Sequence, residues 1–397
     1  MDALQEIDGL VAHGARAPGS DAERRAARGL ASRLRELGRE AHVEPIQVRP
    51  AYGAAHLIHA LAAIAGSVLA VSAPLAAAIL LLATAVSAFG DLTGTFQLAR
   101  RLTGTRASQN VVSPEGGDRP GVLVLVAHYD AGRTGSVFAR AVAARVAALG
   151  ARIRRPIGLL AAFFWSIVVV LACAILRLVG LDATPVALVQ FVATVVLIVS
   201  VPLLVEIQLS GTVPGANDNA SGVATVLRLA ERYGGDLDHF DLWVLFTGAE
   251  EGMELGMRAF LRAHRRELDR SSTAFVCVDQ VGQGTVRYAR REGYVLPQSH
   301  HRALIELCDQ IAAEDADDDR RYGARSYVNR TATDAYPPRA AGFPAVSVSC
   351  LGALDYARHH HLPSDTAENV DPAALERAFG FCSELIELID ERLGPEL

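Results

Sequence analysis

Two long apolar blocks interrupt this chain of 397 residues and limit what it can fold into. The first runs from about Tyr52 to Gly90, too long for one membrane span of about 20 residues, and Ser72-Ala73-Pro74 divides it into two shorter pieces. The second runs from Ile157 to Val205 and is broken between Arg177 and Pro185, which leaves two halves of bilayer length. We therefore expect two transmembrane hairpins. The alternative is a pair of buried helical hairpins inside a soluble protein.

The composition supports a lipid-facing surface and excludes some partners. Hydrophobic residues make up 51% of the chain, more than expected for a soluble α/β enzyme, so part of this content is expected to face lipid. A net charge of -6 argues against nucleic acid as a partner, because binding to phosphates needs a basic face. The five cysteines are odd in number and widely spaced, which indicates buried thiols and not a disulfide framework or a cysteine zinc site.

Outside the two blocks, strand-like and helix-like patterns alternate along the chain. Residues 20–38 form an amphipathic helix pattern, with a capping box of Ser20 and Glu23 and a glycine stop. Short apolar runs rich in β-branched residues predict strands at 121–127, 241–247, 273–279 and 345–350, and helices are expected at 221–233, 252–265, 300–313 and 372–392. This alternation predicts an α/β fold with a helix-flanked, mixed and largely parallel sheet.

One α/β domain accounts for everything outside the apolar blocks. Its parts are residues 1–50, 93–156 and 206–397, and the two inserted hairpins are residues 51–92 and 157–205. An insertion of this kind is tolerated where its two ends stay close together.

Residues of the types that bind metals follow several of the predicted strands. Open α/β sheets gather their sites at the carboxyl ends of strands, so these side chains should meet. Imidazole and carboxylate without thiolate suit Zn²⁺, Mn²⁺ or Co²⁺, and a carboxylate can bridge two ions about 3.5–4 Å apart. The candidates are His128, Asp130, Asp218, Glu250, Glu251, Asp279 and His361.

The order and context of these residues resemble a known family of metallopeptidases. The chain is similar to the two-zinc aminopeptidase and glutamate-carboxypeptidase family, which also contains transferrin-receptor and glutaminyl-cyclase relatives. The resemblance covers essentially the whole chain apart from the apolar blocks. The matching motifs are Arg16-Ala17-Pro18-Gly19-Ser20, Asn110-Val111-Val112, His128-Tyr129-Asp130, Asp218-Asn219-Ala220-Ser221-Gly222, Glu250-Glu251, Asp279 and His361-Leu362-Pro363-Ser364-Asp365-Thr366.

The resemblance implies two zinc ions, with Mn²⁺ or Co²⁺ as substitutes. It assigns His128 and Asp279 to one ion, Glu251 and His361 to the other, and Asp218 to a bridge between them. It makes Asp130 the residue that orients His128 through the other ring nitrogen, and Glu250 the general base. It also implies a cis peptide bond between Asp218 and Asn219.

Two assignments stay open at this point. The family often has Ser-Asp-His before its penultimate strand, whereas this chain has Thr333-Asp334-Ala335. The family also often has, just upstream, a tyrosine that helps to hold the tetrahedral intermediate; here Arg330 occupies that neighbourhood with Tyr327 and Tyr336 nearby, and the choice among the three stays open. In the run His359-His360-His361 the motif spacing selects His361, with His360 as the alternative.

These residues predict an active aminopeptidase that hydrolyses N-terminal peptide bonds. A carboxypeptidase or cyclase of the same family is an alternative, because the metal set does not record which end of a substrate is held. A catalytically dead membrane scaffold is a second alternative, but a scaffold needs neither the ligands nor Glu250. A transporter is disfavoured because the expected spans contain no buried acidic residue, and the only charges are Arg177 and Asp182 at a turn, so no ion path is evident.

Charge predicts how the chain sits in a bilayer. One domain cannot be divided by a membrane, so each block should cross an even number of times, which gives about four spans. The segment between the blocks is rich in arginine and few charges lie in the opposite turns, so the positive-inside rule predicts a cytoplasmic peptidase domain. The first residues lack the features of a cleaved signal peptide, which agrees with this orientation. The expected partners are a peptide substrate and the lipid bilayer.

Overall fold

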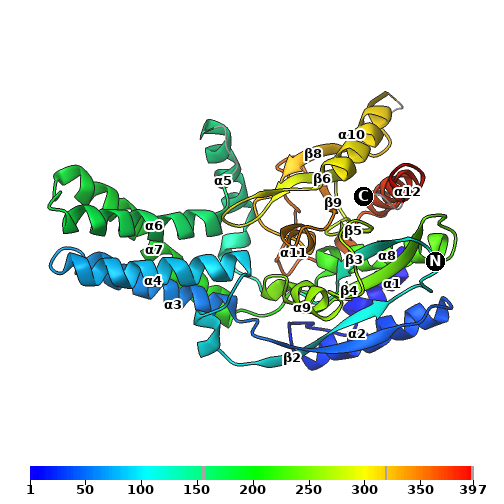
Figure 1. Ribbon diagram of the computed structural model, residues 1–397, viewed down its shortest axis with the longest axis horizontal. Helices are drawn as coiled ribbons and strands as arrows, with labels where there is room; N and C mark the ends of the chain where they lie inside the picture. Colours follow the sequence, from blue (N-terminus) through cyan, green and yellow to red (C-terminus); the bar gives the residue numbers. More distant parts are fainter. Residues whose placement is uncertain (154–156, 318–319, 395–397) are drawn as a thin grey trace.

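A computed structural model describes residues 1–153, 157–317 and 320–394. It contains an α/β body from which a bundle of four long helices projects (Figure 1).

Within the described ranges, nine strands form one mixed sheet. The strand order is β1-β2-β4-β3-β5-β9-β6-β7, and β8 pairs with β6. The neighbours β4, β3, β5 and β9 run parallel, while β1, β2, β6 and β7 are joined by antiparallel pairings. The bounds are β1 (His42–Val48), β2 (Arg106–Ser113), β3 (Gly121–His128), β4 (Phe240–Thr247), β5 (Thr273–Val278), β6 (Thr285–Glu292), β7 (Gln298–Ser299), β8 (Arg325–Val328) and β9 (Ala345–Leu351). The mixed α/β fold is therefore confirmed.

Helices cover both faces of this sheet (Figure 1). One face packs against α1 (Ala3–Val11), α2 (Asp21–Glu36), α8 (Ser221–Tyr233), α10 (Arg302–Asp317) and α12 (Pro372–Leu393). The other face packs against α9 (Leu255–Ala263) and the short α11 (Tyr336–Ala340). In β3, Leu123 and Leu125 belong to the first core while Val124 and Val126 belong to the second. This alternation buries the strand on both sides, as expected for a central parallel strand.

The two apolar blocks form two helical hairpins that pack into one bundle. The helices are α3 (Tyr52–Leu69), α4 (Pro74–Thr93), α6 (Leu159–Leu178) and α7 (Thr184–Leu209), and each is long and apolar enough to cross a membrane. A Cβ on Gly66 would meet the side chain of Leu81 at 2.7 Å, so the small residue lets α3 and α4 approach closely. Large apolar side chains such as Val68 and Phe191 are about two-thirds exposed on the outside of the bundle.

Several predicted boundaries agree with the structure, and others differ; the α10 helix, for example, spans Arg302–Asp317 and not 300–313. The Ser20 hydroxyl caps α2 by accepting from the Glu23 amide at 3.1 Å, as the capping box predicts. The α7 helix extends to Leu209, beyond the predicted end at 205. The α9 helix begins at Leu255 and not at 252, because Met253 and Glu254 adopt positive φ angles of 76° and 53°.

One premise of the sequence analysis is wrong. The α4 helix contains a buried acid, Asp91, which is only 2% exposed and pairs with the buried Arg100. The sequence analysis missed this acid because Asp91 lies at the end of an apolar run. Its partner Arg100 lies outside the apolar block, in the 3-10 turn η1 (Ala99–Leu102). The five cysteines are buried and free, as predicted.

Candidate metal centre

The predicted residues lie at one edge of the sheet because β3, β4 and β5 are parallel neighbours. His128 is the last residue of β3, and Asp279 follows β5 directly. Glu250 and Glu251 lie in the short turn η4 (Glu250–Gly252), which follows β4. The carboxyl ends of these three strands therefore supply four of the predicted side chains to one place.

His128 lies at the centre of the group. Its side chain is nearly buried, and its Nε2 atom is 3.3 Å from Asp218 Oδ1 and 3.5 Å from Asp279 Oδ1. The same nitrogen is 3.8 Å from Glu250 Oε2. The other ring nitrogen, Nδ1, is 3.4 Å from Asp130 Oδ1, on the side expected for an orienting carboxylate.

Asp130 also fixes the turn that carries the two glutamates. Its Oδ1 atom accepts a hydrogen bond from the Glu250 amide at 3.1 Å, and its Oδ2 atom accepts one from the Glu251 amide at 3.0 Å. Asp130 is fully buried, so these charge-assisted bonds are shielded from water. The carboxylate thus couples the end of β3 to the η4 turn.

Asp218 lies in an irregular turn, η3 (Ala216–Ala220), immediately before α8. The Asp365 carboxylate holds this turn by accepting from the Asn217 amide at 2.8 Å and the Asp218 amide at 3.1 Å. Asn219 adds a side-chain bond from its amide to the Val278 carbonyl at 2.9 Å. The Asp218–Asn219 peptide bond is cis, as the resemblance implied.

Both His360 and His361 reach the group. His361 Nε2 is 3.0 Å from Glu251 Oε2 and 3.5 Å from Asp218 Oδ2, whereas His360 Nδ1 is 2.9 Å from the same Asp218 oxygen. A Cβ on Gly132 would lie 2.6 Å from Glu251 Oε1 and from His361 Nε2, so only glycine fits between them. His361 is thus the imidazole that lies beside Glu251, while His360 lies closer to Asp218.

The group concentrates negative charge in a buried place. Burial raises the pKa of Glu250 well above its usual value; the positive charge of His128 opposes this shift, and Asp334 and Glu251 add to it. For His128, burial lowers the pKa, but Glu250 and the other carboxylates outweigh burial and hold it well above the usual value. Burial also raises the pKa of Asp279. A divalent cation would relieve this repulsion.

The donor set fits a metal ion of the zinc type. Three groups of side chains each offer ligand atoms that lie within 4.8 Å of one another. Buried ligand atoms without a hydrogen-bond partner among the described residues include Glu251 Oε1 and Asp279 Oδ1. Imidazole and carboxylate are the ligands that Zn²⁺ accepts in hydrolytic sites. The groups are His128, Asp218 and Asp279; Asp218, His360 and His361; and His128, Glu250 and Glu251.

The three candidates for holding the reaction intermediate lie in different surroundings. Burial raises the pKa of Tyr327 in β8, and the charges of Glu292 and Asp279 add to this shift. Tyr336 is packed in α11, with its ring centroid 6.0 Å from the Arg258 guanidinium. Arg330 places its backbone carbonyl next to Gly158, where an added Cβ would lie 2.8 Å from the carbonyl oxygen.

Other residues around the cluster were not assigned a role in it from the sequence. Arg16 is fully buried, and its guanidinium donates to the carbonyls of Tyr129 at 2.8 Å and Gly215 at 3.0 Å, which links β3 to the η3 turn. The Phe138 ring lies 4.4 Å from the His361 ring, and the Tyr356 ring lies 5.4 Å from that of His360. The sequence signal among these residues was Arg16 in its Arg-Ala-Pro-Gly-Ser motif, since Phe138 lies in the short 3-10 turn η2 (Ser136–Phe138) and Tyr356 in a loop.

Comparison with known proteins gives a family and a fold. Residues 200–386 match the model of peptidase family M28, which confirms the resemblance drawn from the motifs. This stretch contains Asp218, Glu250, Glu251, Asp279 and His361, while His128 precedes it. Among curated protein sequences none matches this chain.

Solved structures share the fold at low identity. A Zn-dependent exopeptidase from Parabacteroides distasonis is 14% identical, with a TM-score of 0.54 over 98% of this chain and 97% of that one. A glutaminyl cyclase from Porphyromonas gingivalis is 15% identical, with a TM-score of 0.54 over 97% and 96%. A leucine aminopeptidase precursor from Bacteroides thetaiotaomicron is 13% identical, with a TM-score of 0.52 over 97% and 95%. At identities this low, the structural similarity shows a common fold and nothing more.

Proposed function

We propose that this chain, whose residues 200–386 match the model of peptidase family M28, is a zinc-dependent exopeptidase that acts as an aminopeptidase. The observation that carries the proposal is the meeting of three imidazoles and four carboxylates at the carboxyl ends of β3, β4 and β5 and in the loops beside them. A protein that served only as a scaffold would have no use for such a buried set, because bringing these charges together without a ligand is costly.

Two zinc ions would be held by side chains that already lie in contact. His128 and Asp279 would hold one ion, Glu251 and His361 the other, and Asp218 would serve both. Bound zinc would polarise the carbonyl of the substrate and lower the pKa of water at the site.

Glu250 is the proposed general base. Its side chain lies 3.8 Å from His128 Nε2, and its amide is anchored by Asp130, so the carboxylate is held beside the proposed ligands without being needed as one. It would take a proton from the attacking water and return it to the departing amine.

The excess of acids favours a substrate that offers a positive charge. Asp334 is buried and bonded to the Thr247 hydroxyl, and both Asp334 and Glu254 add negative potential at Glu250. A free amino terminus carries the complementary charge, whereas a free carboxylate would be repelled. This charge balance supports an aminopeptidase over a carboxypeptidase.

Hydrolysis of a panel of aminoacyl-nitroanilides, with and without a chelator, tests the proposal. We expect metal-dependent release of nitroaniline, abolished by Glu250→Gln and unchanged in the control Glu40→Gln, whose side chain is 84% exposed. A second assay uses a peptide with N-terminal glutamine and measures the release of ammonia. It tests the cyclase alternative, because a cyclase would release ammonia from this peptide and leave the nitroanilides intact. Cleavage only of peptides with a free carboxyl end, or no metal-dependent turnover at all, would overturn the proposal.

We further propose that the four long helices cross a membrane and that the α/β body lies on the cytoplasmic side. Both hairpins leave the body and return to it, which supports an even number of crossings (Figure 1). The arginines between the hairpins support the cytoplasmic side. Reporter fusions after Leu397 and within residues 180–184 test this, and a C-terminus outside the cytoplasm would contradict the orientation while leaving the chemistry unaffected.

A further inference from the structure

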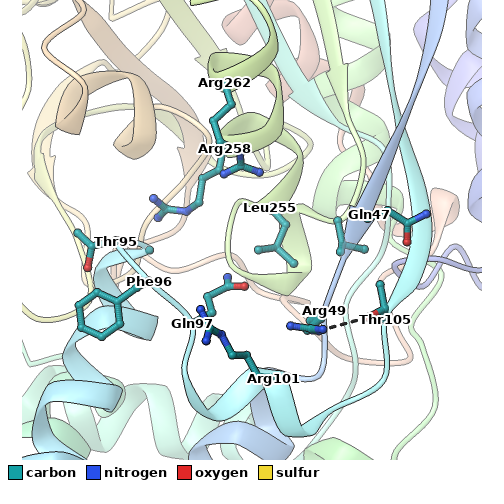
Figure 2. A pocket seen from close by; sticks show the side chains of 12 residues that line it. Gln47, Arg49, Thr95, Phe96, Gln97, Arg101, Thr105, Leu255, Arg258 and Arg262 are labelled. Carbon is teal, nitrogen blue, oxygen red and sulfur yellow. Dashed lines mark hydrogen bonds between the residues drawn. The ribbon is translucent and has the colours of Figure 1, made fainter.

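A cavity of about 460 Å³ lies where the first helical hairpin joins the α/β body. Its walls come from the end of β1, from the loop after α4 together with η1, and from α9 (Figure 2). It is separate from the proposed metal centre, because none of the predicted ligands lines it.

Four arginines line this cavity, and no acidic residue does. They are Arg49, Arg101, Arg258 and Arg262, and Figure 2 shows their side chains around one space. Such a concentration of like charge is unfavourable unless an anion compensates it.

Most of this charge has no carboxylate partner. Arg258 pairs with Glu254 at 2.9 Å, while Arg49 donates to the neutral Thr105 hydroxyl at 3.2 Å. Arg101 and Arg262 form no ion pair with the residues that the structure describes. Burial lowers the pKa of Arg262, and the charge of Arg258 lowers it further, so these two guanidinium groups repel each other.

The cavity lies beside the hairpin that is proposed to enter the membrane. Gly94, just after α4, is in direct contact with Arg258, since a Cβ there would lie 1.9 Å from the guanidinium carbon. Next to Arg101, the side chains of Leu98 and Leu102 are 43% and 77% exposed. Guanidinium groups next to exposed leucines at the end of an apolar helix match the boundary between headgroups and acyl chains.

We propose that this arginine-lined cavity binds a phosphate-bearing anion, supplied either by an anionic phospholipid headgroup or by free phosphate. Guanidinium forks bind phosphate oxygens in a bidentate manner, and the volume is within the range of small-molecule sites. The exposed Leu98 and Leu102 favour the lipid, because they would lie along its acyl chains. The lipid source depends on the proposed membrane insertion, whereas the phosphate chemistry does not.

Binding to the full-length protein in a neutral detergent tests the proposal without any activity measurement. The probes are a short-chain phosphatidylglycerol, a short-chain phosphatidylcholine and inorganic phosphate, each titrated by calorimetry. We expect phosphatidylglycerol to bind at least tenfold more tightly than phosphatidylcholine, and Arg101→Gln/Arg262→Gln to weaken it at least tenfold. Arg302→Gln is the control, since that side chain is 91% exposed and far from the cavity lining.

The outcomes separate the sources. Binding of phosphatidylglycerol much stronger than that of phosphate identifies a lipid site, and equal binding of the two identifies a site for the phosphate group alone. Neither result depends on whether the metal centre is active. Binding that the Arg101/Arg262 double variant leaves unchanged, in a protein with an unaltered melting temperature, would overturn the proposal, as would the absence of binding by both anionic probes.

Discussion

The buried ion pair between Asp91 and Arg100 joins the first helical hairpin to the turn that carries the two glutamates. Arg100 Nε is 2.5 Å from Asp91 Oδ1, and both side chains are at most 1% exposed. Arg100 also donates through Nη1 to the carbonyl of Gly252, at the end of the η4 turn. We expect Asp91→Asn to destabilise the hairpin junction and to lower turnover, because the arginine loses the charge that fixes its direction.

The magnitude follows from burial. Removing one partner of a buried ion pair costs about 3–5 kcal/mol, because the remaining charge is left without compensation. The asparagine oxygen can still accept a bond from Arg100, so we expect the lower end, about 3 kcal/mol. At roughly 2 °C per kcal/mol for a large domain, the melting temperature should fall by about 6 °C.

Thermal unfolding of the purified protein in one detergent measures this effect. Asp182→Asn is the matched control, because Asp182 also pairs with an arginine, Arg177, but is 64% exposed. A surface pair contributes less than about 1 kcal/mol, so the control should melt within about 2 °C of the unmodified protein. If Asp91→Asn melts no lower than Asp182→Asn, the reasoning from burial is refuted.

Three further changes test the site and its support. Glu250→Gln should reduce turnover by several orders of magnitude and retain bound zinc, whereas Glu251→Gln should lose part of the zinc; equal metal content in elemental analysis of the two variants would contradict the separate roles. Gly132→Ala should also lose zinc, because the new Cβ would lie 2.6 Å from Glu251 Oε1, and a normal zinc content would show that the loop can move aside. The hydrogen bond with Glu44 raises the pKa of His264 in the folded protein. The protonated His264 therefore stabilises the fold fully below pH about 6.5, and this stabilisation is lost as the pH rises through the higher pKa of the folded state. His264→Gln should remove this pH dependence of the melting temperature across the same range.

The short-range patterns of the sequence were sufficient for the layout of the site. The strand patterns that end in His128, Asp279 and the Glu250–Glu251 pair are local features, and their parallel pairing brings the ends together. The capping box at Ser20 and the two apolar blocks are also local features of the sequence. The structure contains the cap at the start of α2 and long apolar helices in both blocks.

Contacts between distant segments could not be read in this way. The carboxylate of Asp365 holds the turn around Asp218 from about 150 positions away, and only the folded chain shows which backbone amides it accepts from. The motif spacing selected His361 over His360, but the positions of the two rings, which both lie near Asp218, are visible only in the folded chain.

What the sequence determined by itself is therefore the residue types at the strand ends, the apolar hairpins and the local caps. The tertiary structure alone decided the pairing of Asp91 with Arg100 and the gathering of four arginines around one cavity. The physical reason is that helix and strand preferences act between neighbours along the chain, whereas burial and charge compensation depend on segments that meet only after folding.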